Sequence, residues 1–210
     1  MEDVLLDISV TVDDVLKKLN NLHVDKSAGP DNLHPKVLYE VRQSISYPLS
    51  IIFNKSLSEG VLPEEWKNAI LSPIFKNKGD KKQPCNYRPV SLTCVICKVC
   101  ESLIRDKLMK HLLENNLLSD CQYGFRPGRS CSIQLLEVLD HWSSLLDNFC
   151  SVDTIYLDFS RAFDTVPHER LIGKLYNLGI QGKVLDWIKC FLQIDPSELD
   201  LIIHTLLELK

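Results

Sequence analysis

Apolar residues recur every three to four positions over most of the chain, which is the spacing of a helix with one buried face. Pro48 lies inside one such run and is expected to kink or split its helix. Ser130 or Ser132 is placed to cap another helix, and Pro167 and Gly179 suit the first turn and the end of a third. The pattern predicts helices at residues 10–22, 35–58, 91–115, 133–148, 167–178 and 183–192.

Two other runs are predicted to be strands. The first, "WKNAILSPIFK" at residues 66–76, contains Pro73, a residue that is tolerated on an edge strand. The second, "TIYLDF" at residues 154–159, is an apolar run that ends at the carboxylate of Asp158. The sequence has no internal repeat and no low-complexity segment. We therefore expect a helix-rich α+β fold with few strands.

The bulk composition is that of a globular protein. With 210 residues the chain is long enough for one domain with a real core, or for a domain and a half. No apolar run approaches the ~20 residues of a membrane span, and the acidic start "MEDVLLDISVTVDD" lacks the basic stretch of a signal peptide. We expect an intracellular protein, cytoplasmic or nuclear, that is neither secreted nor bound to a membrane.

Charge is unevenly distributed along the chain, whose net charge is −4. Acids gather at both ends, with five in residues 1–14 and four in residues 195–210. Residues 76–88, "KNKGDKKQPCNYR", instead carry five bases against one acid. This basic stretch is compatible with a phosphate-binding face. Composition alone favours a solvated lysine-rich loop.

The eight cysteines are expected to stay reduced, because nothing indicates a secretory route. Cys94, Cys97 and Cys100 form a CxxCxxC motif, which is also the spacing of some zinc and iron–sulfur ligands. In a helix, however, residues three apart share one face. No fourth ligand follows at a metal-type spacing, so we expect these three side chains to act as small core residues.

The stretch "TIYLDFSRAFDTVPH" places two acids near the end of a predicted strand. A phosphoaspartate site would need a second Asp two residues after Asp158, where the sequence has Ser160. A structural interpretation has Asp158 pairing with Arg161 while Asp164 caps a helix. In a third interpretation Asp158 binds Mg²⁺, which takes hard oxygen ligands and usually only one or two carboxylates.

Five motifs separate these alternatives. They are "KSAGPDNLHP", "LSPIFKNKGD", "NYRPVSLTCVICKVCESLIRDKL", "QYGFRPGRSC" and "YLDFSRAFDTVPHERLIGKLYNLGI". In this order and spacing, from about Lys26 to Leu192, the chain resembles the reverse transcriptases of non-LTR retrotransposons of the jockey or CR1 sort. The resemblance implies the fingers and a partial palm of a right-hand polymerase, with an incomplete sheet. The expected segments are an acidic N-terminal extension (1–25), a fingers-like region (26–150), the first part of the palm (151–192) and a divergent tail (193–210).

The resemblance also implies roles for particular residues in binding a deoxynucleotide and Mg²⁺. Asp158 matches the first catalytic metal ligand, and the Phe159 carbonyl matches an auxiliary ligand. Phe163 matches the steric gate that excludes a ribose 2′-hydroxyl. Arg88 matches the fingers arginine that holds the triphosphate, and Lys76 matches a second triphosphate contact. Asp164 is expected to cap a helix.

The nucleic-acid partners implied by the resemblance are an RNA template and a DNA primer. Arg126 and Arg129, in "GFRPGRS", are expected to contact backbone phosphates, which position a nucleic acid without reading its sequence. Lys81 and Lys82 are expected to add to the same surface. The implied reaction is two-metal transfer of a dNTP onto the primer 3′-hydroxyl. For the two arginines, an exposed loop without such contacts stays the alternative.

The chain departs from the family's pattern in its last part. The family's palm carries a downstream Asp-Asp hairpin and a Pro-Gln-Gly segment, whereas the one Asp-Asp pair here is Asp13-Asp14, upstream. Gln181-Gly182 sits between two predicted helices, and the apolar tail begins with a helix-start pattern at Asp195. We expect a polymerase fragment that is inactive alone, its strand edge covered by the tail. The alternatives are a non-catalytic nucleic-acid-binding module and a functionless remnant of a mobile element.

Overall fold

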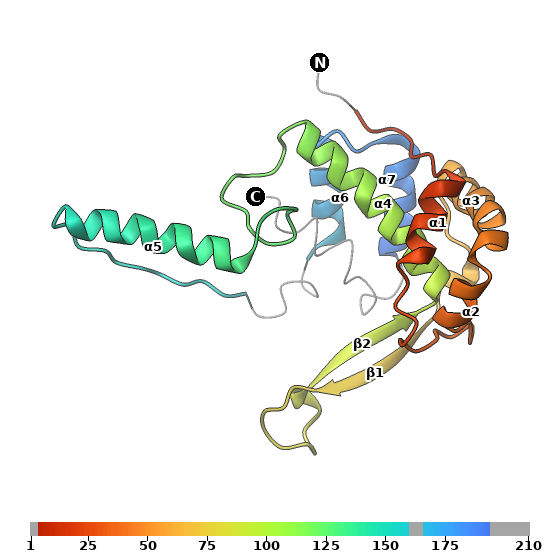
Figure 1. Cartoon of the computed structure of the whole chain (residues 1–210), viewed down its shortest axis with the longest axis horizontal. Coiled ribbons are helices and arrows are strands. Elements are labelled where there is room, and N and C mark those ends of the chain that lie inside the picture. Colours follow the sequence, from red (N-terminus) through yellow and green to blue (C-terminus); the bar gives the residue numbers. More distant parts are fainter. Residues whose placement is uncertain (1–3, 160–165, 194–210) are drawn as a thin grey trace.

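The computed structural model describes residues 4–159 and 166–193 and has the expected helix-rich α+β composition (Figure 1). None of the described helices is long and apolar enough to cross a membrane. The helices are α1 (Val12–Asn20), α2 (Pro35–Glu40), α3 (Arg42–Glu59), α4 (Val95–Glu114), α5 (Cys131–Asp147), α6 (His168–Asn177) and α7 (Gly182–Leu192). The strands are β1 (Ala69–Phe75) and β2 (Tyr87–Thr93), and short 3-10 helices lie at Glu64–Lys67 and Pro84–Asn86.

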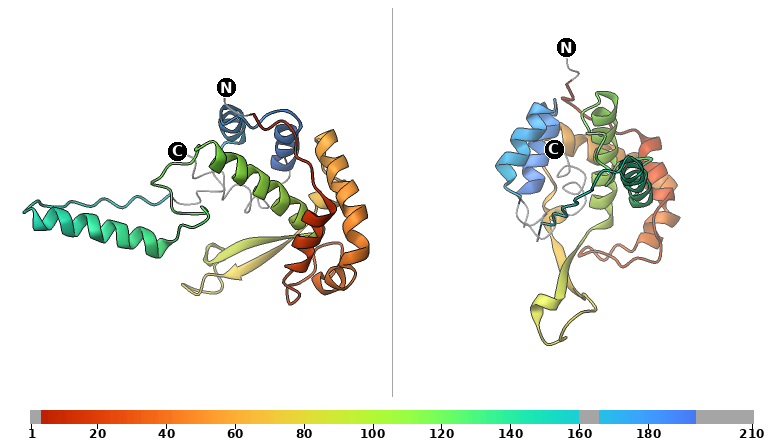
Figure 2. Two further views of the ribbon diagram at one scale, coloured as in Figure 1. Left: turned by 45° about the horizontal axis from the view of Figure 1, so that its top comes forward. Right: turned by 90° about the vertical axis from the view of Figure 1, so that its left-hand side faces the viewer.

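The core lies around α4, the longest helix. Figure 2 shows α4 between α1 and α3 on one side and α6 and α7 on the other. Apolar side chains of α4 at three- and four-residue spacing are buried, as expected for a helix packed on several sides. The predicted core role of the three cysteines is confirmed, because Cys94, Cys97 and Cys100 are at most 2% exposed.

The N-terminal residues belong to this core. Thr11 caps α1 with a reciprocal capping box to Asp14, and Val15 and Leu19 are fully buried. Before the helix, the Asn54 side-chain amide accepts a hydrogen bond from the Val10 N–H and donates one to the Val10 carbonyl. The acidic N-terminal segment is thus packed from Ile8 onward, and the boundary at residue 25 stays a prediction.

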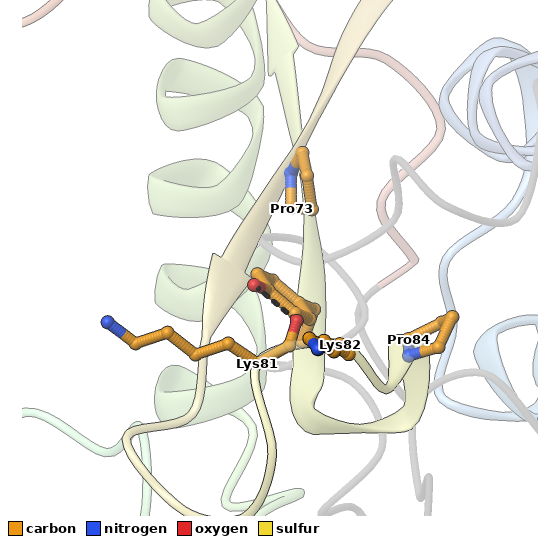
Figure 3. A pocket seen from close by; sticks show the side chains of 5 residues that line it. Pro73, Lys81, Lys82 and Pro84 are labelled. Atoms are coloured by element: carbon orange, nitrogen blue, oxygen red, sulfur yellow. Dashed lines mark hydrogen bonds between the residues drawn. The ribbon is translucent and has the colours of Figure 1, made fainter.

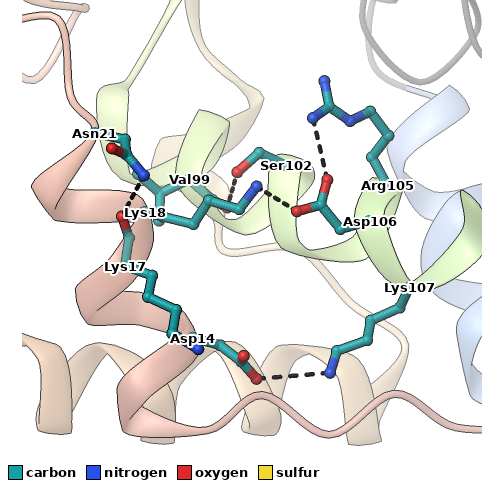
Figure 4. A network of polar contacts seen from close by, with 9 residues as sticks. All are labelled: Asp14, Lys17, Lys18, Asn21, Val99, Ser102, Arg105, Asp106 and Lys107. Atoms are coloured by element: carbon teal, nitrogen blue, oxygen red, sulfur yellow. Dashed lines mark hydrogen bonds and ion pairs between the residues drawn. The ribbon is translucent and has the colours of Figure 1, made fainter. Parts of the chain in front are cut away.

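Ion pairs connect α1 to α4 (Figure 4). Lys18 of α1 contacts Asp106 of α4, and Arg105 donates a second hydrogen bond to the same carboxylate at 3.1 Å. Lys107 Nζ lies 3.6 Å from Asp14 Oδ2, at the other end of α1. The two helices are therefore held by charge pairs at their surface as well as by their buried apolar faces.

The predicted helix at residues 35–58 is split, but not at Pro48. The break falls at Val41, which ends α2 and begins α3, while Pro48 lies inside α3. The prediction placed the break at the strongest local helix breaker. Pro48 is instead accommodated inside α3, which buries Phe53, whose ring meets Trp66 edge-on at 5.7 Å. On the same helix Ser56 accepts a hydrogen bond from the Trp187 indole at 2.9 Å.

The first predicted strand is confirmed as β1, which pairs with β2 in an antiparallel hairpin. Pro73 faces Pro89 in this two-stranded ladder, so both prolines lie where a missing N–H is tolerated. β2 takes up Ser91–Thr93, which the periodicity assigned to a helix, and α4 starts only after Cys94. The helix prediction was therefore wrong over its first four residues.

The second predicted strand does not form. Residues 151–159 run back beside α5 without regular secondary structure, and the described residues provide no strand that pairs with them (Figure 1). A strand is stable only when a neighbour accepts its backbone hydrogen bonds, so an apolar run alone does not make one. α5, by contrast, forms where predicted and is capped by Ser130, whose Oγ accepts from the Ile133 N–H.

Candidate nucleotide and nucleic-acid interface

The β1–β2 hairpin brings two of the predicted phosphate ligands to one face. Arg88 lies opposite Ile74 in the ladder, and the Lys76 N–H donates to the Asn86 carbonyl at 2.8 Å, which extends the ladder by one pair. Because side chains alternate between the faces of a strand, Lys76, Ile74 and Arg88 share one face. Diagonal neighbours of this kind have Cα atoms about 7–8 Å apart.

The two basic side chains on this face differ in how they are held. Lys76 Nζ donates to the Cys85 carbonyl at 2.8 Å, so its ammonium is tied to the turn of its own hairpin. The Arg88 side chain is exposed and makes no hydrogen bond or ion pair with the residues that the structure describes. All donors of its guanidinium are therefore open to an external anion.

Lys81 and Lys82 lie toward the other face of the hairpin. A shallow hollow of about 500 Å³ is lined by Pro73, Pro84, Tyr87, Lys81 and Lys82 (Figure 3). Tyr87 alternates with Arg88 along β2 and so faces away from it. Its hydroxyl donates to the Lys81 carbonyl at 2.9 Å and fixes the loop. The basic stretch at residues 76–88 thus divides into two groups.

Arg126 and Arg129 organise the loop between α4 and α5. Arg126 donates to the Ser119 carbonyl at 2.8 Å and to Asp120 Oδ1 at 3.3 Å. The Arg129 guanidinium lies over the Tyr123 ring, 4.8 Å from its centroid. These contacts hold both arginines against their own loop, which is compatible with the alternative of an exposed loop without phosphate contacts. Whether they also contact phosphates stays a prediction.

A groove beside this loop contains an arginine that the motif analysis missed. It has a volume of about 350 Å³ and brings Arg105 of α4 next to Arg126 and Phe125, a half-exposed aromatic residue. Met109 also lines it, and Arg105 and Met109 are four residues apart on one helix face. This helical spacing was the signal in the sequence that could have found the groove. A motif search misses it, because it compares residues along the chain and not residues that meet in space.

Asp158 and Phe159 lie on the exposed stretch that follows α5, and the Phe159 side chain is 78% exposed. Within the described ranges, no group of three His, Cys, Asp or Glu side chains is placed to bind a metal ion. A solvated carboxylate is still a hard oxygen donor of the kind that Mg²⁺ takes, with water and phosphate as further ligands. The predicted roles of Phe163, Asp164 and Arg161 fall outside the described residues, as does the helix start at Asp195.

Sequence comparison assigns the chain to a family. A model of the family described as "Reverse transcriptase (RNA-dependent DNA polymerase)" matches residues 76–205. That is more than half of the chain, so the chain belongs to the reverse transcriptase family, as its motifs indicated. The match contains all the predicted site residues and continues into the tail that the motif analysis set apart from residue 193.

The relatives are reverse transcriptases of non-LTR retrotransposons. The probable RNA-directed DNA polymerase from transposon BS of Drosophila melanogaster is 30% identical over 169 residues, which are 80% of this chain and 19% of the relative. The probable RNA-directed DNA polymerase from transposon X-element of the same organism is 32% identical over 155 residues, which are 73% of this chain and 16% of the relative. The polymerase of the jockey element of the same organism is 28% identical over 170 residues. The chain thus spans less than a fifth of these relatives.

Proposed function

We propose that the chain is the part of a non-LTR RNA-directed DNA polymerase that grips the incoming dNTP and the primed RNA template. The observation that carries the proposal is the hairpin face on which Arg88, exposed and without an ion pair among the described residues, lies beside Lys76. The family match supports it, because it begins at residue 76 and includes the whole loop and β2. In this account residues 26–150, which include the hairpin, are the fingers, and residues 151–192 are the first part of the palm.

Arg88 is suited to hold a triphosphate. Its planar guanidinium presents donors that match two phosphate oxygens at once. Lys76 lies on the same face and supplies a second positive charge, which is concentrated on its ammonium group. To contact a phosphate, this group must share or release its hydrogen bond to the Cys85 carbonyl. Preplaced cations of this kind stabilise charge that builds on a phosphate during transfer.

The proposed metal ligands are Asp158 and the Phe159 carbonyl. Mg²⁺ bound there would supply the charge that activates a primer 3′-hydroxyl and neutralises the triphosphate. The Asp158 carboxylate is exposed to solvent, so it can bind the metal ion without the cost of burying its charge. Phe163 is proposed as the steric gate against ribonucleotides, and Asp164 as a helix cap.

The template grip is proposed to combine Arg126 and Arg129 with Lys81 and Lys82. Such contacts set the position of a strand on the protein and do not read its bases. We expect the 210 residues by themselves to bind rather than to polymerise, because Asp158 is the one residue among them that matches the family's catalytic carboxylates. A nucleic-acid-binding module is therefore the second candidate function.

The proposal is tested by dNTP binding, measured with a fluorescent dNTP in the presence of Mg²⁺. Arg88→Ala is expected to weaken binding by about tenfold or more, since it removes a charge-assisted, bidentate contact. Lys82→Ala is the matched control. It removes one charge from the same hairpin, at the hollow on the face away from Arg88, and should change the affinity for dNTP by less than about twofold. Equal losses in the two variants would contradict the proposal, because only net charge would then matter.

A further inference from the structure

Two cysteines lie at the first turn of α4, where the β-hairpin joins the helical bundle. Cys94 is the N-cap of α4, and its sulfur accepts a hydrogen bond from the Cys97 N–H at 3.3 Å. The N-cap and third residue of a helix have Cα atoms about 5–6 Å apart, which is within the span of a disulfide.

A buried carboxyl group lies directly beside this pair. The Cys97 thiol donates to Glu101 Oε1 at 3.0 Å, and Glu101 is 5% exposed. Burial raises the pKa of Glu101. The hydrogen bond from Cys97 lowers the pKa of Cys94, while that bond, burial and Glu101 together raise the pKa of Cys97. In C-x-x-C dithiols the more acidic thiol reacts first and the buried thiol resolves the product.

We propose that Cys94 and Cys97 form a reversible disulfide, with hydrogen peroxide as the oxidant and Glu101 as the proton acceptor of Cys97. The Cys94 thiolate attacks one peroxide oxygen, the O–O bond breaks, and the leaving hydroxide is protonated to water. The resulting sulfenic acid is attacked by the Cys97 sulfur as Glu101 takes its proton. The S–S bond forms, the S–O bond breaks, and hydroxide leaves and is protonated. Two thiols and one peroxide thus give one disulfide and two waters.

The site is placed to act on the hairpin. Cys94 is the single residue between the end of β2 at Thr93 and the start of α4 at Val95. Gly29 packs closely against this junction, since a Cβ at this position would lie 2.6 Å from the Thr93 carbonyl oxygen. A disulfide here fixes the point from which the hairpin projects (Figure 1). The two cysteines are 2% and 0% exposed, so an oxidant close to water in size is the class that fits.

The experiment treats the folded 210-residue chain with hydrogen peroxide, blocks remaining thiols with N-ethylmaleimide and analyses tryptic peptides by mass spectrometry. The peptide at residues 83–98 contains Cys85, Cys94 and Cys97, because Arg88 is followed by a proline. Expected is a peptide with one blocked cysteine, Cys85, and a disulfide between the other two, which dithiothreitol reduces to two free thiols while Cys85 stays blocked. Cys85→Ser should keep the disulfide. Cys97→Ser should leave a sulfenic acid on Cys94 that dimedone captures.

Glu101→Gln tests the proton acceptor, since it keeps the size and the accepting oxygen of the side chain. Disulfide formation should slow by about tenfold or more in this variant, with circular dichroism showing that it is folded. Blocking of both thiols after peroxide treatment would overturn the proposal, as would equal rates in the folded chain and in urea. An unchanged rate in Glu101→Gln would overturn the role of that carboxyl.

Discussion

Gly29 shows at the scale of one residue how a turn motif is tied to the rest of the fold. The sequence marks "KSAGPDNLHP" as turn chemistry, but it does not show that Gly29 lies against another segment. In the structure a Cβ at this position would come within 2.6–2.9 Å of backbone atoms of Thr93 and Cys94. The glycine is therefore required by close approach of two chain segments at the base of the hairpin.

Gly29→Ala should destabilise the chain, because backbone cannot move aside as a flexible side chain can. We expect a loss of about 1–3 kcal/mol in the free energy of unfolding, measured by urea denaturation. The matched control is Gly173→Ala in α6, where a Cβ meets nothing within 4 Å. That variant should be unchanged or more stable by up to about 1 kcal/mol. Equal stability of the two variants would contradict the packing described for Gly29.

Individual residues of the candidate site also show what sequence motifs reveal and what only the folded structure reveals. Arg88 and Lys76 were found by resemblance, but their shared hairpin face depends on the pairing of β1 with β2, which motif positions do not state. Arg105 lies within a quoted motif that assigned it no role, and it is recognised only because the loop folds back and brings Arg126 beside it. Contacts between residues distant in sequence are the part that a single sequence leaves open.

At the scale of elements, most helices followed from local sequence, whereas only one of the two predicted strands formed. α1, α5, α6 and α7 lie where periodicity and capping residues predicted them, since a helix satisfies its own backbone. The hairpin strand at Ala69–Phe75 was also predicted, but the run at residues 154–159 failed for lack of a pairing strand among the described residues. The break at Val41 rather than Pro48 shows that a proline inside a periodic run does not by itself end a helix.

The junction of α1 and α4 makes a prediction about acid stability. Burial alone would raise the pKa of Asp106, but hydrogen bonds from Lys18 and Arg105 outweigh it and hold the pKa below its ordinary value. A lowered folded-state pKa gives stability that is present above the unfolded pKa of about 3.9 and is lost as pH falls further. Asp106→Asn should therefore cost about 0.5 kcal/mol at neutral pH, reduced by solvent screening of a half-exposed pair.

The measurement is urea denaturation of both proteins from neutral pH down to about pH 3. The stability difference should shrink below about pH 4, because the wild-type carboxylate then takes up its proton. Glu114→Gln is the control, since Glu114 pairs with Lys110 within α4 alone and should show little change at any pH. A difference between wild type and Asp106→Asn that persists unchanged through this range would contradict the ion-pair account.

At the scale of the whole molecule, two segments project from the bundle, and one of them is basic. The hairpin with residues 76–88 extends away from α4, and α5 extends in another direction with the stretch that carries Asp158 beside it (Figure 1). α5 has no buried residue, and its leucines at positions 135, 136, 139 and 146 are more than half exposed. In the N-terminal segment the apolar residues Val10, Val15 and Leu19 are buried in the core, while Asp7 and Asp13 are exposed. The mild net negative charge therefore does not describe the surface that a phosphate backbone would meet.

The measurement that tests the central claim most directly is binding of a primed RNA template across a series of salt concentrations. Affinity should fall linearly with the logarithm of salt concentration, by about 0.7–0.9 in log K per phosphate contact. Lys81→Ala with Lys82→Ala should lower that slope by roughly one to two contacts. Lys55→Ala with Lys183→Ala, which removes the same charge from α3 and α7, should leave the slope unchanged. Binding that is absent, insensitive to salt, or equally weakened by both pairs would contradict the account.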